Sequence, residues 1–255
     1  MRLSVHSLFD SATFNERLFF PGGAQSPRPR GALDLMIAVP GAELHARWHR
    51  ATAAQATILL FHGNGEVVAD YDSAARQFAV AGAELLVVDF RGYGQSTGTP
   101  TLRDAIEDAR RVVQRIGGEL RRPLVVMGRS VGSACAAELY GAGLPELRAV
   151  IWESGSVDLA GLALRREMAL PDGEDHSFFD PRPKLRRGTL PLLILHGAED
   201  AIISVAEAQE AAAIAGSSDK TLVIIPERGH NNVASSERYW EAITAFVTKV
   251  TGEPE

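Results

Sequence analysis

The sequence predicts an α/β protein in which a mostly parallel, twisted β-sheet is covered by helices on both faces. Six short runs are almost continuously apolar, which is typical of strands that are buried on both sides. Helical stretches separate these runs, and alternating strands and helices favour parallel pairing. The runs are ATILLFH (56–62), AELLVVDF (83–90), PLVVMGR (123–129), RAVIWES (148–154), PLLILHG (191–197) and KTLVIIP (220–226).

The region before the first of these runs has a different pattern. LDLMIAV (33–39) and AELHARWHR (42–50) flank Pro40-Gly41, and apolar and polar residues alternate along the second run. This arrangement predicts an antiparallel hairpin, which we expect at one edge of the sheet. The first thirty residues are punctuated by proline and glycine and are expected to be irregular.

The predicted helices carry recognisable signals at their ends. The stretch 101–117 opens with Thr101 and Asp104, an acidic variant of the capping box, and stops at a glycine pair. The stretch 66–82 ends in Gly82, a residue suited to a helix C-terminus. The same scheme predicts helices at 130–143, 204–216 and 235–250.

The longest break in the alternation covers residues 155–190. A connection of this length is usually functional or mobile, so we interpret it as a short cap or lid over the site. The sequence shows no internal repeat and no linker that would separate two domains. We therefore expect residues 1–255 to form a single domain that includes this cap.

Composition excludes several classes of function. The formal net charge is −6 and no Lys/Arg-rich run is present, so nucleic acid is not an expected partner. No apolar run is long enough for a membrane-spanning helix, and residues 1–20 lack the apolar region of a secretory signal. We therefore expect a cytoplasmic protein. The single cysteine, Cys135, is flanked by alanines and is expected to be a small buried core residue.

Two segments match the pattern Gly-x-Ser-x-Gly, centred on Ser96 and Ser130. A nucleophile elbow requires a strand that enters directly and a helix that leaves directly. Ser130 has this setting, because an apolar run precedes it and a helical stretch follows it. The sequence RGYG separates Ser96 from its strand, and Pro100 delays the next helix, so Ser96 is expected to be a loop residue.

A serine nucleophile needs a histidine base and a carboxylate that orients it. His230 lies between the last predicted strand and the last predicted helix, and Asp200 follows the preceding strand in HGAED. Both are therefore expected at the carboxyl edge of the sheet, where ligands bind. Glu199 and Asp158 are alternative acids. Six other histidines compete with His230, at positions 6, 45, 49, 62, 176 and 196.

Attack on a carbonyl creates an oxyanion that requires fixed hydrogen-bond donors. We expect one donor to be the backbone N–H of Val131, the residue after the nucleophile. The second is expected to be the backbone N–H of Asn64, in the His-Gly-Asn-Gly turn after the first parallel strand. Glycines in such a turn also fit a purely structural strand-to-helix connection.

Taken in order, LLFHGNG, VVDFRGYGQSTGTP, MGRSVGSA, LHGAED and ERGHN resemble the motif series of the α/β-hydrolase superfamily. The DFRGYGQSTGTP stretch is similar to its serine-aminopeptidase-like branch, which includes depalmitoylases. The resemblance covers roughly residues 33–250 and implies an esterase, thioesterase or peptidase that needs no cofactor and no metal. Arg129 departs from the family pattern, in which neutral or acidic residues often precede the nucleophile.

These observations predict a serine hydrolase that cleaves an ester or thioester of a small acyl substrate through an acyl-enzyme. Phe178 and Phe179 could line the acyl site together with Leu164, or could instead attach the cap to the sheet. A peptidase of the serine-aminopeptidase type and a non-catalytic ligand-binding protein are the alternatives. The sequence does not indicate an oligomeric state.

Overall fold

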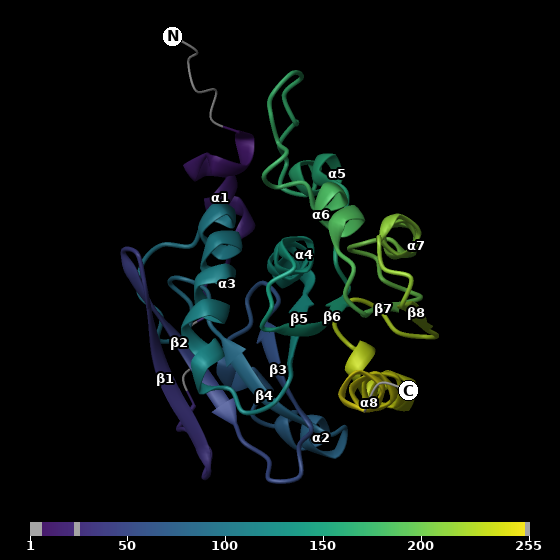
Figure 1. Ribbon diagram of the computed structural model, residues 1–255. Helices are drawn as coiled ribbons and strands as arrows, with labels where there is room; N and C mark the ends of the chain where they lie inside the picture. The colour runs from purple at the N-terminus through teal and green to yellow at the C-terminus, as the bar shows by residue number, and fades with distance from the viewer. Residues whose placement is uncertain (1–6, 23–25, 253–255) are drawn as a thin grey trace.

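In the computed structural model, which describes residues 7–22 and 26–252, eight strands form one sheet (Figure 1). Their order is β1-β2-β4-β3-β5-β6-β7-β8. β1 pairs antiparallel with β2 and β2 with β4, whereas all other neighbours are parallel. The predicted fold and the edge hairpin are therefore confirmed. The strands are β1 (Ala32–Val39), β2 (Ala42–His49), β3 (Ala56–Phe61), β4 (Ala83–Val88), β5 (Leu124–Arg129), β6 (Leu147–Glu153), β7 (Leu192–Gly197) and β8 (Lys220–Ile225).

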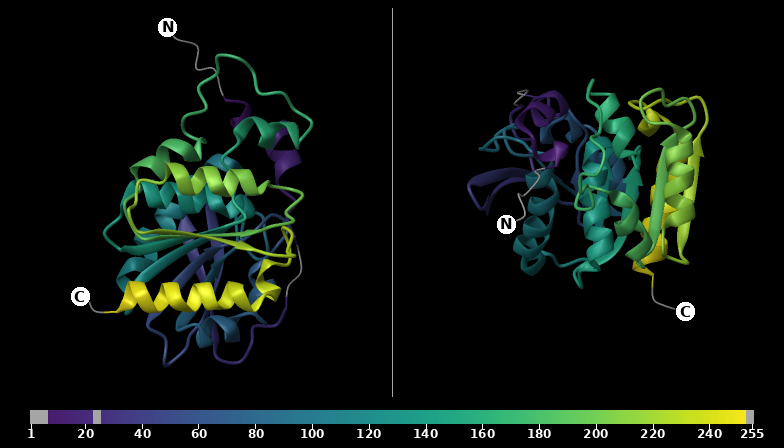
Figure 2. Two further views of the ribbon diagram at one scale, coloured as in Figure 1. Left: turned by 90° about the vertical axis from the view of Figure 1, so that its right-hand side faces the viewer. Right: turned by 90° about the horizontal axis from the view of Figure 1, so that it is seen from above.

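Helices cover both faces of this sheet. The left view of Figure 2 shows α7 and α8 on opposite sides of the strands. Helices α3, α4, α6 and α7 contribute to the core on one face, and α2 and α8 to the core on the other. The helices are α1 (Ala12–Leu18), α2 (Ala75–Val80), α3 (Leu102–Ile116), α4 (Ser133–Ala142), α5 (Leu159–Leu164), α6 (Pro181–Arg187), α7 (Val205–Ile214) and α8 (Glu237–Thr251).

The two cores follow from the period of two along each strand. In β3, Ile58 and Leu60 belong to the core under α2 and α8, whereas Leu59 and Phe61 belong to the core under α3 and α4. Successive side chains of a strand point to opposite faces, so an apolar run without alternation must be covered twice. Packing of helices on both faces holds the sheet in place. It also holds the carboxyl edge, where β3, β5, β7 and β8 end.

The N-terminal segment corrects one prediction in part: residues 8–18 are mainly helical, whereas residues 19–22 and 26–30 form no helix or strand, as expected. A short 3-10 helix (Leu8–Asp10) leads into α1, and the Ser11 hydroxyl accepts a hydrogen bond from the Phe14 amide as an N-cap. Phe9, Phe14 and Leu18 are buried. Burial of these apolar side chains therefore stabilises α1. The expectation of an irregular segment rests on the prolines and glycines that follow in the sequence. Residues 1–6 lie outside the described part of the chain.

The 155–190 segment contains two short helices, α5 and α6, joined by a loop that lies beside the N-terminal helices (Figure 1). The Ser7 hydroxyl is 2.8 Å from Nδ1 of His176, and the Leu8 amide donates to Glu174 at 2.9 Å. The rings of Phe9 and Phe179 are 5.3 Å apart. Two stretches far apart in sequence thus form one layer above the carboxyl edge of the sheet.

Two further predictions concern single features. Cys135 in α4 is fully buried, its thiol donates to the carbonyl of Ala105, and burial raises its pKa. It is therefore the core residue that the sequence predicts.

Among residues 7–22 and 26–252, no helix combines the length and the apolar character needed to cross a bilayer.

Candidate active site

Ser130 occupies a sharp turn between β5 and α4. Its φ is +51°, which is unusual for a residue with a side chain. A Cβ at position 128 would lie 2.3 Å from the carbonyl oxygen of Gly132, and one at position 132 would lie 2.1 Å from that of Phe61. Glycines at both positions therefore allow the backbone to crowd the turn. This geometry is that of a nucleophile elbow, which presents the serine above the sheet.

The structure brings Ser130, His230 and Asp200 together from three different loops. Nε2 of His230 is 2.9 Å from Oγ of Ser130, and Nδ1 is 2.7 Å from Oδ2 of Asp200. These contacts connect a hydroxyl, an imidazole and a carboxylate in the order that proton transfer from serine requires. His230 lies after β8 and Asp200 after β7, so the parallel sheet accounts for their meeting.

Asp200 is a fully buried carboxylate with several donors around it. Oδ1 accepts hydrogen bonds from the amides of Ile202 and Ile203 at 2.9 Å each. Burial alone would raise the pKa of Asp200. The hydrogen bonds from His230 and from these amides have a larger combined effect, so the net pKa lies below the ordinary value. Asp200 is therefore an anion at neutral pH, as the orientation of an imidazolium requires.

The alternative acids and the competing histidines make other contacts. Glu199 is exposed, and Asp158 is the residue before α5, where its amide donates to Ser156 and Glu207. His196 is buried near Asp200 and donates to the carbonyl of Ile203 at 2.9 Å. Of the other competing histidines, His45, His49 and His62 contact aspartates near β2 and β3, His176 contacts Ser7, and His6 lies outside the described residues.

Asn64 and Val131 lie on the same pocket as Ser130. The Asn64 side chain is fixed from both ends: Nδ2 donates to the carbonyl of Leu18 at 2.5 Å, and Oδ1 accepts from the Tyr93 hydroxyl at 2.6 Å. Burial raises the pKa of Tyr93 to about 12, so the phenol stays a donor at neutral pH. The turn that carries the Asn64 backbone N–H is thus held rigidly against α1.

This pocket encloses about 580 Å³ of space, part of it open to solvent. Phe179 lines it, but Phe178 does not, since its ring packs 4.2 Å from the Arg103 guanidinium. Leu164 is 74% exposed, so it is not the apolar lining residue that we considered. The pocket is lined by Leu18, Asn64, Leu102, Ser130, Val131, Ser133, Ala134, Ser156, Leu159, Leu162, Arg166, Phe179 and Pro181.

Arg129 points away from the pocket into a buried polar network. Its guanidinium is 3.1 Å from Glu153 at the end of β6 and 3.0 Å from Glu66. Nη2 also donates to the carbonyl of His230 at 3.2 Å. Glu66 in turn accepts from the amide of Gly63 at 2.7 Å. One side chain thus connects the elbow, the turn before Asn64 and the loop that carries His230.

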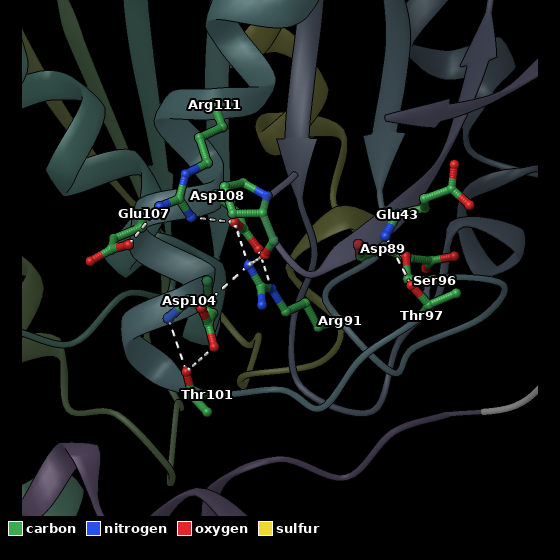
Figure 3. Close-up of polar contacts among 12 residues, drawn as sticks. Glu43, Asp89, Arg91, Ser96, Thr97, Thr101, Asp104, Glu107, Asp108 and Arg111 are labelled. Atoms are coloured by element: carbon green, nitrogen blue, oxygen red, sulfur yellow. Dashed lines mark hydrogen bonds and ion pairs between the residues drawn. The ribbon is translucent and has the colours of Figure 1, made fainter. Parts of the chain in front are cut away.

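The second serine motif lies on the glycine-rich loop after β4 (Figure 3). Ser96 is buried, and its hydroxyl accepts from the His45 amide at 2.8 Å and donates to the Asp89 carbonyl at 3.0 Å. Figure 3 also shows Arg91, which pairs with Asp108 at 2.7 Å and holds the loop against α3. Ser96 is therefore a loop residue, as its sequence context predicts.

Three residues near the site escape prediction from sequence. Leu18 reaches the pocket from α1, Arg166 reaches it from the turn after α5, and Arg129 acts as the connector described above. The N-cap Ser11 followed by Phe14 and Leu18 at helical spacing is a signal that could have revealed α1. No comparable pattern marks Arg166, whose position depends on tertiary packing.

The family model described as serine aminopeptidase, S33, matches residues 52–169 and 181–236. Protein YfhR of Escherichia coli K12, described as uncharacterised, is 28% identical over 206 residues, covering 77% of this chain and 72% of its own. Human α/β hydrolase domain-containing protein 17B is 27% identical over 209 residues, covering 77% and 67%. Protein bem46 of Schizosaccharomyces pombe is 25% identical over 206 residues, covering 76% and 67%.

Solved structures show the same fold. An esterase of Pyrococcus furiosus superimposes with a TM-score of 0.75 at 18% identity, covering 91% of this chain and 99% of its own. Esterase 2 of Thermogutta terrifontis, phosphorylated by paraoxon, gives a TM-score of 0.68 at 18% identity, with 90% and 98% covered. The predicted resemblance to the serine-aminopeptidase-like, depalmitoylase-like branch is confirmed, and the chain belongs to the serine aminopeptidase S33 family of α/β-hydrolases.

Proposed function

We propose that this protein is a serine hydrolase that cleaves a carboxylic ester or thioester through an acyl-enzyme, with Ser130, His230 and Asp200 as its catalytic triad. The observation that carries the proposal is the continuous contact from the Ser130 hydroxyl through His230 to the buried carboxylate of Asp200. Membership of a serine hydrolase family supports the same chemistry. The expected substrate is a small acyl compound, and the expected location is cytoplasmic.

In the first step, the Ser130 hydroxyl attacks the acyl carbon while its proton passes to Nε2 of His230. The amides of Asn64 and Val131 stabilise the resulting oxyanion. His230 then gives the proton to the departing alkoxide or thiolate, which leaves the acyl group on Ser130. Water then loses a proton to His230 and attacks the acyl carbon, and His230 returns this proton to Oγ of Ser130 as the carboxylic acid leaves.

Residues 1–255 are proposed to form one domain, in which the 155–190 segment acts as the cap of the acyl pocket. This segment supplies apolar lining residues such as Leu159, Leu162 and Phe179. Burial of an apolar acyl chain against them would contribute about 25 cal/mol for each Å² removed from water. Phe178 is assigned to attachment of the cap rather than to the substrate, because it packs against Arg103.

The test is hydrolysis of p-nitrophenyl butyrate by the wild type and by Ser130→Ala. Loss of the nucleophile should lower kcat by about 10⁴-fold or more, because the remaining groups of a triad cannot replace it. Ser96→Ala is the matched control and should keep its kcat, since Ser96 lies outside the pocket. Full activity of Ser130→Ala would contradict the proposal.

A peptidase is the second candidate, since the matching family model carries the description serine aminopeptidase. The same triad can cleave an amide if His230 protonates the amine that leaves. Comparison of kcat/KM for aminoacyl p-nitroanilides and for p-nitrophenyl esters separates the two activities. An absence of turnover on both, together with no labelling by a fluorophosphonate, would favour a ligand-binding protein on the same fold.

A further inference from the structure

Arg166 places a positive charge in a pocket that is otherwise mainly apolar. It lies on the turn after α5 and lines the same pocket as Ser130, Asn64 and Val131. Among the described residues, it is the only charged one that lines this pocket. Leucines, an alanine, a proline and Phe179 make up most of the remaining wall.

Among the described residues, the Arg166 guanidinium has no carboxylate partner, unlike the two arginines beside it. Arg165 pairs with Glu207 at 3.7 Å, and Arg17 lies 4.0 Å from Glu167. Within residues 7–22 and 26–252, Nε of Arg166 is buried without a hydrogen-bond partner. Burial, together with the charge of Arg165, lowers its pKa. A partly buried cation in this state is stabilised when an anion binds to it.

The backbone at Arg166 is held by hydrogen bonds from α1. Nη1 of Arg17 in α1 donates to the carbonyl of Arg166 at 3.0 Å and to that of Glu167 at 3.2 Å. Cζ of Arg166 lies 5.6 Å from the centre of the Phe20 ring, a weak cation–π contact. The N-terminal helix and the 155–190 segment together hold this residue at the pocket.

We propose that Arg166 is a specificity residue and that the preferred substrate carries an anionic group, such as a carboxylate, a few bonds from the scissile carbonyl. The inference deepens the proposed hydrolase function and rests on it for the position of the carbonyl. An apolar segment would occupy the leucine-lined wall while the planar guanidinium binds the anion through paired N–H donors. A neutral ester of the same length would leave the cation without a partner.

Matched ester pairs test this preference, with turnover followed by titration of the released acid. For an anion on the acyl side, monomethyl adipate is compared with methyl hexanoate. For an anion on the alcohol side, the butyrate ester of 3-hydroxypropanoate is compared with propyl butyrate. The wild type should show a higher kcat/KM for the anionic member of at least one pair, which identifies the side. Arg166→Gln should lower that ratio about tenfold, equivalent to 1.4 kcal/mol.

Two variants serve as controls for this experiment. Arg166→Lys keeps the charge and should keep part of the preference. Arg115→Gln removes an exposed charge from α3 that does not line the pocket, and it should leave the ratio unchanged. An equal ratio in the wild type and in Arg166→Gln, for both pairs, would overturn the inference.

Binding to an inactive background separates this inference from the proposed function. In Ser130→Ala, calorimetry should show tighter binding of the anionic ester than of its neutral partner in at least one of the two pairs. The double variant Ser130→Ala/Arg166→Gln should lose that difference. If the wild type hydrolyses no ester, the proposed function fails, and the calorimetric comparison still decides the role of Arg166: equal affinities in the two backgrounds would overturn it.

Discussion

Two serines of this chain lie in the same five-residue pattern, and each is close to a buried aspartate that contacts a histidine. At Ser130, the hydroxyl is 2.9 Å from the His230 ring, which is 2.7 Å from Asp200. At Ser96, the hydroxyl bonds the main chain of His45 and Asp89, while the His45 ring contacts the Asp89 carboxylate at 2.9 Å.

The two clusters contain the same residue types. They differ in where the serine hydroxyl points and in whether it lines a pocket. The hydroxyl of Ser130 points to an imidazole nitrogen and lines a pocket, so it can react with a ligand. The hydroxyl of Ser96 satisfies two buried backbone groups and connects a loop to β2. In this chain, the motif presents its serine to a pocket where a strand enters and a helix leaves the turn at the carboxyl edge of the sheet.

The largest expected effect separates the two histidines. His230→Ala should lower kcat on p-nitrophenyl butyrate by about 10⁴-fold or more, because Ser130 loses its base. His45→Ala should instead lower the free energy of unfolding by about 1–3 kcal/mol, because the buried Asp89 loses a donor. Ester turnover and urea unfolding of both variants measure the two effects. A large loss of kcat in correctly folded His45→Ala would break the distinction between the clusters.

Each cluster also has its own arginine, which gives the second prediction. Arg129→Met should lower kcat by about 10–100-fold with little change in KM, because the loops that carry Asn64 and His230 lose a shared anchor. Arg91→Met removes the Asp108 ion pair of the other loop and should affect stability more than kcat. Steady-state kinetics beside thermal unfolding separate these outcomes. A wild-type kcat in correctly folded Arg129→Met would show that Arg129 is not a positioning residue.

A smaller effect is expected from pH on the structural cluster. Burial alone would raise the pKa of Asp89. Hydrogen bonds from His45, His62 and the Val68 amide have a larger combined effect, so the net pKa lies below the ordinary 3.8. A depressed folded-state pKa stabilises the protein above the unfolded-state value, and this contribution is lost as the pH falls through the folded-state value.

The stability difference between wild type and Asp89→Asn should therefore be full at pH 6 and should shrink below pH 3.8. Urea unfolding at several pH values, from pH 6 to below pH 3.8, measures it. A difference that is independent of pH, or that grows in acid, would show that Asp89 does not act as a carboxylate in the folded protein.

The smallest expected effect concerns Ser96 itself. Ser96→Ala leaves the amide of His45 and the carbonyl of Asp89 without this partner and should lower the free energy of unfolding by about 1–3 kcal/mol. Turnover of the folded variant should stay near that of the wild type. Thermal unfolding in parallel with an ester assay measures both quantities, and a stability equal to that of the wild type would argue against the structural role.

Much of the fold is predictable because its signals are local. The runs that form β3 to β8 are apolar without alternation, and Gly128 and Gly132 flank a serine between strand and helix. Chain order along the parallel sheet is enough to bring His230 and Asp200 to the same edge. These features depend on neighbours within a few residues or on topology, which the strand–helix alternation specifies.

The lining of the pocket is not predictable in the same way. Phe178 and Phe179 are adjacent in sequence, yet only Phe179 faces the pocket. Leu18 and Arg166 reach it through packing between α1 and the turn after α5, which no local pattern encodes. Side chains on irregular segments depend on tertiary contacts, so the specificity of the site is harder to infer than its chemistry.

We propose that Ser130, and not Ser96, is the serine activated by its histidine. The decisive measurement is incubation of the folded protein with a fluorophosphonate probe, followed by digestion and mass spectrometry of the peptides. We expect one adduct, on Ser130, with strongly reduced labelling in His230→Ala. An adduct on Ser96, or no adduct on the folded wild type, would contradict it.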